Sequence, residues 1–325
     1  MFTESNTVQD FIADTLSKMG WTDIHPDSLN RDINQVLLES NLRDALIRLN
    51  PEIEANPDRA DEVFYKLRAI IQGVESDGVV KANEDFTSWL KGEKSMPFGE
   101  NNQHTTVRLI DFKNLENNEY VISKEVSYQS RETKRFDLVC YINGIPLIVG
   151  EMKTPVRDSI TWLDGAIQIY DNYVGTVPAF FVPNLFSFSS DGRGYRYGTI
   201  SMSANQWFPW GESGSEDRLS SVKDSVQKML QPELILDILN NFTVFGTDKN
   251  RRKNKLICRH QQYEGAKMVV DRVVNGQIKK GLIWHFQGSG KSLLMVFAAQ
   301  ILRLHPELNN PTVLVVVDRV DLDTQ

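Results

Sequence analysis

The sequence predicts an α/β protein with two domains: a helical and mixed-sheet domain over residues 1–245, and the start of a parallel α/β lobe over residues 246–325. Three patterns support this prediction. Apolar residues recur at helical intervals through most of the first ninety residues, short β-branched segments follow from about residue 104, and helix and strand patterns alternate after residue 256. A chain of 325 residues is also longer than most chains that fold around a single hydrophobic core.

The composition is that of a soluble globular protein, with 41% hydrophobic and 24% charged residues. No apolar run approaches the ~18 residues of a membrane-spanning helix, and the first residues lack the apolar core of a signal peptide. Cys140 and Cys258 alone provide neither a disulfide framework nor metal-ligand spacing. We therefore expect a cytoplasmic protein without a membrane partner. The net charge of −7 describes the average surface and leaves a local basic site open.

Helices are predicted over residues 7–19, 34–50 and 59–74, where Gly20 and Pro51 provide stop signals. Short strands are predicted over residues 105–112, 119–129, 135–142 and 145–153. Asn143 and Gly144 lie between the last two apolar runs and predict a hairpin turn. A helix is expected from about residue 159 to 173, then one or two strands within residues 179–190, a loop over residues 209–218 and a helix over residues 232–242.

A possible catalytic site lies at the end of the segment "LVCYINGIPLIVGEMK". Glu151 and Lys153 are two residues apart and share a face of a strand, and Asp137 lies fourteen residues before Glu151. If the hairpin forms, the three side chains can converge. Asp137, Glu151 and the carbonyl of Met152 would then offer hard oxygen ligands to Mg²⁺, and Lys153 could orient or deprotonate a water that attacks a phosphodiester.

The alternative is a surface ion pair between Glu151 and Lys153, with Asp137 unrelated. Such spacing is frequent in strands. The apolar run before Glu151 indicates a buried strand, in which unpaired charges are costly, and this favours the site.

A glycine-rich loop between a predicted strand (281–286) and a predicted helix is typical of phosphate binding. It consists of Gly288, Ser289, Gly290, Lys291 and Ser292. Its N–H groups would face a phosphate, Lys291 would reach the β and γ phosphates, and Ser292 would bind Mg²⁺. The match to G-x-x-x-x-G-K-[ST] is incomplete, because His285 stands at the first glycine position. A second strand is predicted over residues 312–319.

Arg259 and Gln262 precede this loop, and a glutamine at that place could read an adenine edge, which would make the nucleotide ATP. Residues 249–255 include five basic residues. Two interpretations of this run remain open, a solvated interdomain linker and an arm that contacts phosphates.

Several segments together resemble the restriction (R, motor) subunit of type I restriction-modification enzymes. "RFDLVCYINGIPLIVGEMKTP" is similar to its nuclease core of the PD-(D/E)xK type, "GLIWHFQGSGKSLLM" to its Walker A segment and "VLVVVDRVDLDTQ" to its next helicase motif. "RDINQVLLESNLRDALIRLNP" is similar to its amino-terminal helical region. The resemblance implies a mixed-sheet PD-(D/E)xK endonuclease-like domain, followed by the beginning of a RecA-like motor lobe.

The resemblance also implies roles for residues. Asp137, Glu151 and Lys153 would form the DNA-cleavage site, and the loop from Gly288 to Ser292 would bind ATP and Mg²⁺. The family's Q-x-x-x-Y motif assists cleavage. Here Gln168 matches its glutamine, whereas Tyr173 lies one position later than its tyrosine.

The implied partners are duplex DNA and the modification (methyltransferase) and specificity subunits, with ATP-driven DNA translocation coupled to cleavage. The motif that supplies the acidic Mg²⁺ ligand for ATP hydrolysis and the second motor lobe are not among these residues, so we do not expect the chain to hydrolyse ATP. Two other functions remain: a non-cleaving module that docks partners or grips DNA, and a helicase with a fused repair nuclease.

Overall fold

The computed structural model describes residues 8–154, 159–211 and 219–316. The chain forms two compact units. The first consists of residues 1–236 and 245–256, and the second of residues 237–244 and 257–325. The domain boundary after residue 245 stays a prediction. In the described part of the chain, no helix is both long and apolar enough to cross a membrane.

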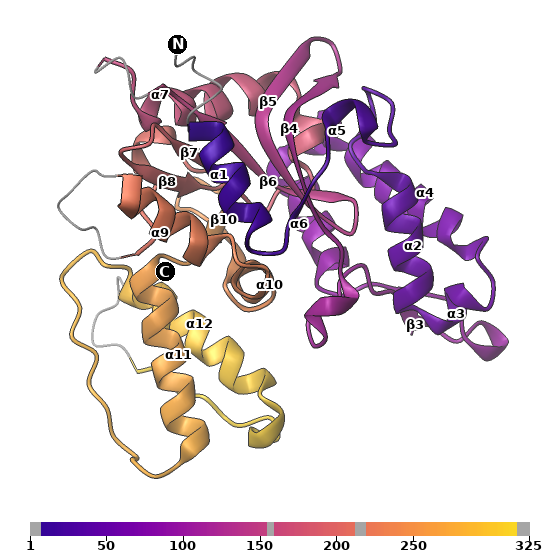
Figure 1. The fold of residues 1–325 in the computed structure, drawn as a ribbon. Coiled ribbons are helices and arrows are strands. Elements are labelled where there is room, and N and C mark those ends of the chain that lie inside the picture. Colours follow the sequence, from indigo (N-terminus) through magenta and orange to yellow (C-terminus); the bar gives the residue numbers. More distant parts are fainter. Residues whose placement is uncertain (1–7, 155–158, 212–218, 317–325) are drawn as a thin grey trace. The chain divides into compact units, whose positions relative to one another are not determined.

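A mixed sheet of six strands forms the centre of the first unit (Figure 1). In spatial order the strands are β1 (Thr22–Asp23), β4 (Tyr120–Gln129), β5 (Thr133–Ile142), β6 (Ile145–Met152), β7 (Phe186–Ser190) and β8 (Tyr195–Gly198). The pairs β1–β4 and β6–β7 are parallel, and the other neighbours are antiparallel. The three strands predicted over residues 119–153 are confirmed. Every residue of β6 is buried, as expected for a strand covered on both faces.

The predicted hairpin between β5 and β6 is confirmed. Asn143 and Gly144 have φ angles of 50° and 75°, and these two positive values characterise a type I′ turn. The Asn143 side chain is buried, accepts the N–H of Glu119 at 2.8 Å and donates to the carbonyl of Leu109 at 2.9 Å. The turn is therefore held inside the unit.

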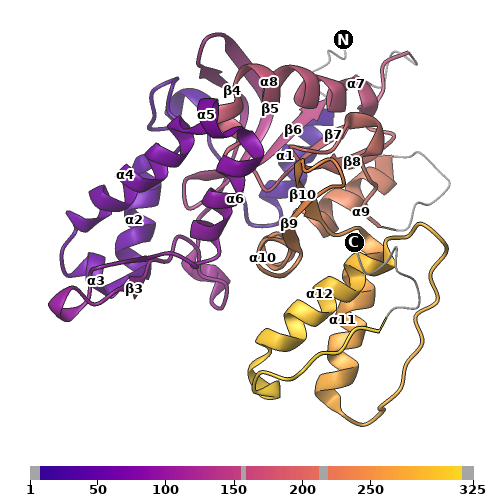
Figure 2. The same cartoon turned by 180° about the vertical axis from the view of Figure 1, so that it is seen from behind.

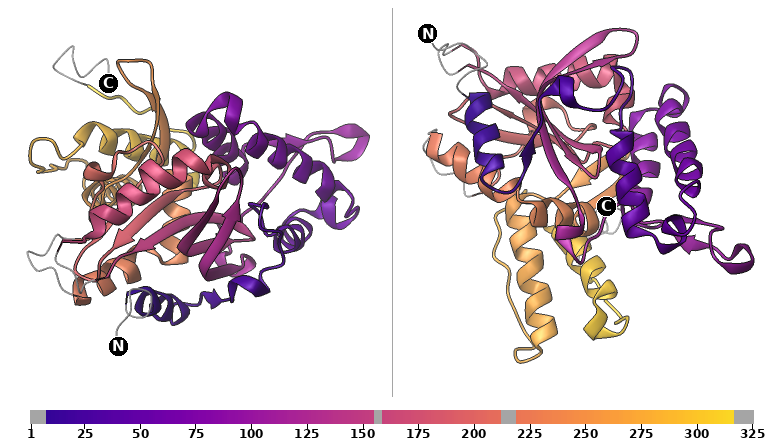
Figure 3. Two further views of the ribbon diagram at one scale, coloured as in Figure 1. Left: turned by 90° about the horizontal axis from the view of Figure 1, so that it is seen from above. Right: turned by 45° about the vertical axis from the view of Figure 1, so that its right-hand side comes forward.

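The sheet lies between two helical layers, as the left panel of Figure 3 shows. On one face α1 (Val8–Ser17) contacts β4 and β5 and packs beside α9 (Leu219–Met229). On the other face lies the crossover from β6 to β7, because parallel neighbours need a long connection. It consists of α7 (Trp162–Ile167), the π-helical segment η5 (Gln168–Tyr173) and α8 (Val174–Thr176). The predicted helix over residues 159–173 thus exists, with a π-helical second half.

A group of helices follows the first strand (Figure 2). It contains α2 (Glu39–Leu49), α3 (Pro51–Glu54), α4 (Arg59–Gln72), α5 (Val74–Asp77) and α6 (Val79–Leu90). The helix predicted over residues 59–74 is confirmed by α4, whereas the helix predicted over residues 34–50 begins only at Glu39, as α2. Pro51 both ends the second predicted helix and begins α3.

One strand prediction in the first unit is only partly right. Residues 105–112 contain just β3 (Thr105–Thr106), which pairs with β2 (Ser95–Met96). Beyond it the backbone of Arg108 bonds to the side chain of Asn50, at 2.7 Å and 2.9 Å, in place of a neighbouring strand. The prediction of one or two strands within residues 179–190 is confirmed by one strand, β7, which follows a 3₁₀-helix at Pro178–Phe181. Residues 212–218 of the predicted loop lie outside the described residues.

The basic run over residues 249–255 is not a linker. It forms the turn and part of the second strand of a hairpin between β9 (Thr243–Thr247) and β10 (Lys253–Ile257). Before it, α10 (Pro232–Asn241) confirms the helix predicted over residues 232–242.

The second unit contains α11 (His260–Asn275) and α12 (Lys291–Leu304), which pack against each other. The two strands predicted for it are wrong as far as residues 281–286 and 312–316 are described, since neither segment is a strand. The side chains of Leu282 and Trp284 are 84% and 89% exposed. A strand requires a neighbour for its backbone hydrogen bonds, and neither segment has one within the described residues. Residues 317–319 lie outside them.

Candidate active site

Asp137 and Glu151 lie side by side because the strand register shifts by one residue within the hairpin. The shift follows the first two pairs of β5 and β6, and after it Leu138 pairs with Gly150. The next position in this register places Asp137 opposite Glu151, on the same face of the sheet. Without the shift, Asp137 would lie opposite Gly150. β-Bulges often re-aim side chains in this way beside active sites.

The Asp137 carboxylate is fixed at the end of β6. Its Oδ2 accepts the N–H of Met152 at 2.7 Å, and Gln9 of α1 donates to the Asp137 carbonyl at 2.5 Å. Met152 therefore contacts Asp137 through its backbone N–H, which fixes the position of the Asp137 carboxylate. The carbonyl of Met152 as a metal ligand stays a prediction.

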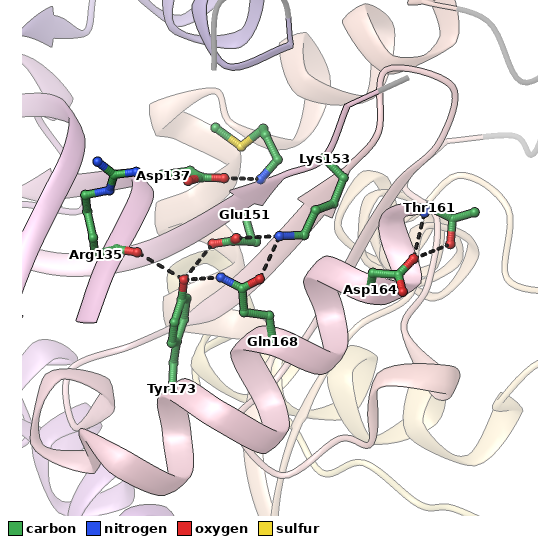
Figure 4. A network of polar contacts seen from close by, with 9 residues as sticks. Arg135, Asp137, Glu151, Lys153, Thr161, Asp164, Gln168 and Tyr173 are labelled. Atoms are coloured by element: carbon green, nitrogen blue, oxygen red, sulfur yellow. Dashed lines mark hydrogen bonds and ion pairs between the residues drawn. The ribbon is translucent and has the colours of Figure 1, made fainter. Parts of the chain in front are cut away.

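Lys153 links Glu151 to the crossover helix, as Figure 4 shows. Its Nζ lies 2.8 Å from Glu151 Oε1 and 2.6 Å from Gln168 Oε1. The Glu151 and Lys153 side chains are only 2% and 15% exposed. This is a buried pair, so the alternative of a surface ion pair does not describe it.

Tyr173 enters the same network through the π-helical turn (Figure 4). In an α-helix the residue four positions on lies over the first, and the wider π turn moves this place to the fifth position. Gln168 Nε2 accordingly donates to the hydroxyl of Tyr173. That hydroxyl lies 3.2 Å from Glu151 Oε2 and 3.0 Å from the carbonyl oxygen of Arg135. The one-position offset from Q-x-x-x-Y is therefore compensated by the helix geometry.

The start of α7 is fixed by three hydrogen bonds. Thr161 Oγ1 accepts the N–H of Leu163 at 3.3 Å, and Asp164 Oδ2 accepts the N–H of Thr161 at 2.7 Å, which together form a capping box. The N–H of Trp162 donates to Asp191 Oδ2 at 3.1 Å. These contacts hold the helix that carries Gln168.

Gly165 lets α7 approach the sheet closely at the site. A Cβ atom on this residue would lie 2.3 Å from Ser189 Oγ and 3.2 Å from Glu151 Cγ. Ser189 is the register partner of Glu151 on β7 and is fully buried. Within the part of the chain that the structure describes, its hydroxyl has no hydrogen-bond partner. A buried polar group without a hydrogen-bond partner destabilises the fold, so such groups are rare in native proteins and Ser189 is unusual at this position.

Both carboxyl groups are perturbed. Burial raises the pKa of Glu151 to about 7; the charge of Asp137 also raises it, while Lys153 and Tyr173 oppose the rise. Burial raises the pKa of Asp137 as well, against the opposing effects of the Met152 N–H and Lys153. Two acids that resist ionisation side by side are typical of functional sites.

The residues present fit Mg²⁺, which proteins usually hold through one or two carboxylates and waters. A cation would relieve the repulsion between the buried Asp137 and Glu151 anions. No group of three or more His, Cys, Asp or Glu side chains among the described residues is arranged to hold a metal.

Glu125 of β4 was not predicted as part of this site. It lies between Lys124 and Val126, which pair with Leu138 and Phe136, and hence stands opposite Asp137. Its φ of 56° is unusual for a residue other than glycine, and its charge contributes to the raised pKa of Asp137. Neither the register nor this φ has a signal in the sequence. Ser189 likewise was not predicted, since one serine in an apolar strand has no distinguishing pattern.

In the second unit, the predicted phosphate loop precedes α12. Gly288 and Gly290 have φ of 81° and 80°, which glycine adopts without strain. Lys291 Nζ donates to the carbonyls of His285 at 3.2 Å and Phe286 at 3.0 Å. Ser289 is buried, and Ser292 lies in the first turn of α12. The loop, the helix start and the lysine are thus brought together.

Arg259 and Gln262 contact this loop directly. Arg259 Nη1 donates to the carbonyl of Gly288 at 3.2 Å, and Gln262 Nε2 donates to that of Gly290 at 2.9 Å. Gln262 Oε1 accepts the N–H of Arg259 at 2.8 Å, and the side chain is 1% exposed. The Gln262 amide therefore braces the loop here, and an adenine contact stays a prediction.

Comparison with known proteins bears out the predicted family. A family model described as "Type I restriction enzyme R protein N terminus" matches residues 1–206, and one described as "SWI2/SNF2 ATPase" matches residues 261–325. The chain is 31% identical to the type I restriction enzyme HindI endonuclease subunit of Haemophilus influenzae, over 98% of this chain and 32% of that relative. It is 25% identical to the putative type I restriction enzyme MjaIXP endonuclease subunit of Methanocaldococcus jannaschii, over 99% and 33%.

The chain spans about a third of the length of these curated relatives. The first match covers well over half of the chain, including the sheet and the network around Glu151. The chain belongs to the type I restriction enzyme R protein N-terminal family.

Proposed function

We propose that the first unit carries the Mg²⁺-dependent DNA-cleaving centre of a type I restriction enzyme R subunit, in a nuclease domain of the PD-(D/E)xK type. One observation carries the proposal. Glu151, Lys153, Gln168 and Tyr173 form a single hydrogen-bonded network beside Asp137, and this network joins the end of β6 to the helical crossover that follows it. A structural ion pair would not need the glutamine and tyrosine as well.

Asp137 and Glu151 are the proposed metal ligands, with Met152 contributing its carbonyl. The bound Mg²⁺ would supply Lewis-acid stabilisation of the charge that develops on the phosphate. Lys153 is held between a carboxylate and an amide oxygen, so its Nζ is aimed and can orient a water or transfer a proton at the site. Gln168 and Tyr173 position Lys153 and Glu151.

The decisive experiment uses the complete subunit assembled with its modification and specificity partners. Asp137→Ala should abolish cleavage of a plasmid that carries the recognition site. The matched control, Asp44→Ala, removes an exposed carboxylate from α2 and should leave cleavage intact. Undiminished cleavage by Asp137→Ala would refute the proposal and favour the non-cleaving module that grips DNA or docks partners.

Metal binding gives a readout that does not depend on activity. Calorimetric titration of this chain with Mg²⁺ should release or absorb heat that Asp137→Ala abolishes and Asp44→Ala retains. Equal heats for all three proteins would show that the ion binds elsewhere.

For the second unit we propose ATP binding in a RecA-like motor lobe, supported by the match to the SWI2/SNF2 ATPase family and the loop ahead of α12. Lys291→Ala should weaken ATP binding to the complete subunit, and equal affinities would contradict this. In the full subunit we propose that ATP-driven translocation of duplex DNA is coupled to cleavage. Co-purification with modification and specificity subunits would support this, whereas their absence would favour a helicase with a fused repair nuclease.

A further inference from the structure

The hairpin of β9 and β10 carries a basic tip, defined here as Lys249, Arg251 and Arg252 (Figure 2, labels β9 and β10). All three residues are exposed and lie within four positions of the chain. The chain as a whole has a net charge of −7, so this tip is a local exception to an acidic surface. An attraction for an anion would come from the tip and not from the average charge.

The turn that carries the basic tip is ordered by Asp248. Its Oδ1 accepts the N–H groups of Asn250 at 2.9 Å and Arg252 at 2.8 Å. Its own N–H donates to the carbonyl of Arg252 at 2.9 Å, and its carbonyl accepts the N–H of Arg251 at 2.9 Å. The one carboxylate within the turn is thus used by the backbone. The tip is ordered without a ligand, which lowers the entropy cost of binding.

The other two basic residues of the run anchor the hairpin. Lys253 forms an ion pair with Glu84 of α6. Lys255 is buried, and its Nζ donates to the carbonyl of Asn184 at 2.6 Å. Ser201 Oγ also accepts the N–H of Lys255 at 2.9 Å. The run therefore divides into two structural lysines and three exposed cations on a firmly attached turn.

We propose that the basic tip binds the sugar-phosphate backbone of duplex DNA. Residues 245–256 belong to the first unit, so a DNA contact made there is carried by the unit with the proposed cleavage centre, and the inference rests on that proposed function. Arginine donates two parallel hydrogen bonds to a phosphate, and such contacts fix a protein on DNA without reading the sequence. The tip would hold the duplex, and other groups would select the site.

The salt dependence of DNA binding tests this proposal. The affinity falls as salt rises, and each phosphate contact contributes about −0.9 to the slope of log K against log salt concentration. Loss of the three cations of the basic tip should therefore make this slope less steep by about 2.7. Fluorescence anisotropy of a labelled duplex of about 30 base pairs, between about 50 and about 200 mM KCl with EDTA present, measures the slope. The variant combines Lys249→Ala, Arg252→Ala and Arg251→Asn. Asparagine replaces Arg251 because its φ is 61°, a value that asparagine tolerates.

A control variant removes the same charge elsewhere. Lys66→Ala, Lys113→Ala and Lys228→Ala change three exposed lysines outside the hairpin. The proposal expects the control to retain nearly the full slope, and circular dichroism should show both variants folded. It is overturned if the control loses as much as the tip variant, if the tip variant keeps the slope, or if the unchanged chain does not bind the duplex.

Asp137→Ala separates this proposal from the proposed function, because it should keep the slope while losing cleavage. If Asp137→Ala still cuts and the tip variant loses the slope, only the cleavage centre is wrongly assigned. If the tip variant keeps its DNA slope but no longer co-purifies with the partner subunits, the tip contacts protein and the proposal fails.

Discussion

Replacing Glu151 by glutamine should change how stability depends on pH. Glutamine has nearly the shape of glutamate and cannot ionise, so the substitution removes the titration of a carboxyl that is 2% exposed. Burial raises the pKa of this carboxyl in the folded chain to about 7 from an ordinary value of 4.5. Between these two values the folded chain binds more protons than the unfolded chain does.

The sign follows from linkage. The stabilisation is present in full below the ordinary pKa and is lost as pH rises through the folded-state pKa of about 7. When the pH is raised from about 5 to about 8.5, this shift in the pKa of Glu151 lowers the unfolding free energy of the native protein by about 2.5 kcal/mol. Glu151→Gln does not pay this cost, so the difference between native protein and variant should move by about 2.5 kcal/mol in favour of the variant.

Urea unfolding with EDTA present, followed by tryptophan fluorescence at the two pH values, measures this difference. Glu116→Gln removes an exposed carboxylate and reports the effect of net charge alone. Adding Mg²⁺ at the higher pH should stabilise the native protein more than Glu151→Gln, because a cation favours the ionised carboxyl. A difference that is independent of pH, or one of opposite sign, would refute the reasoning about Glu151.

Three further substitutions test residues beside Glu151 and the glycine-rich loop of the second unit. Gly165→Ala should destabilise the chain by about 1–3 kcal/mol in urea unfolding, because its Cβ would lie 2.3 Å from Ser189 Oγ. Gly175→Ala, which meets no atom within 4 Å, should not. Tyr173→Phe should slow plasmid cleavage by the assembled enzyme by roughly tenfold while leaving the fold intact, since it removes the hydroxyl that contacts Gln168, Glu151 and the carbonyl of Arg135 and keeps the ring; an unchanged rate would exclude Tyr173. Gln262→Ala should weaken ATP binding by the complete subunit, and unchanged affinity would show that the loop needs no brace.

The sequence was sufficient for the hairpin but not for its register. Asn143 and Gly144 identify the turn, because few residue pairs accept two positive φ angles. The one-residue shift that places Asp137 opposite Glu151 has no such local signal, because it depends on packing across the whole sheet. Asp137 could therefore be selected as a candidate, while its alignment with Glu151 had to be observed.

The helix after Thr161 illustrates a second limit. A helix was expected from about residue 159, close to the observed start at Trp162, but the change to π-helical geometry at Gln168 was not. Helical periodicity assumes that side chains four positions apart share a face, so Tyr173 appeared misplaced in the sequence. The contact with Gln168 exists because the chain accommodates one extra residue within a single turn.

The second unit shows the opposite case. Residues 281–286 and 312–316 have the apolar pattern of buried strands, yet no strand is present there among the described residues. The pattern of apolar residues in a segment indicates that it tends to form a strand, but a strand also needs neighbouring strands for its backbone hydrogen bonds. Helices α11 and α12 make their backbone hydrogen bonds within themselves, and the helix predicted after the glycine-rich loop is present as α12.

The crossover from β6 to β7 has a consequence for control of the site. Asp137 and Glu151 lie on strands in the middle of the sheet, whereas Gln168 and Tyr173 lie on one connecting segment above it. A local opening of this segment would separate Lys153 from its amide partner and leave the carboxylates in place. Hydrogen exchange of residues 162–176 would then report how often this segment opens and the network around Lys153 is broken.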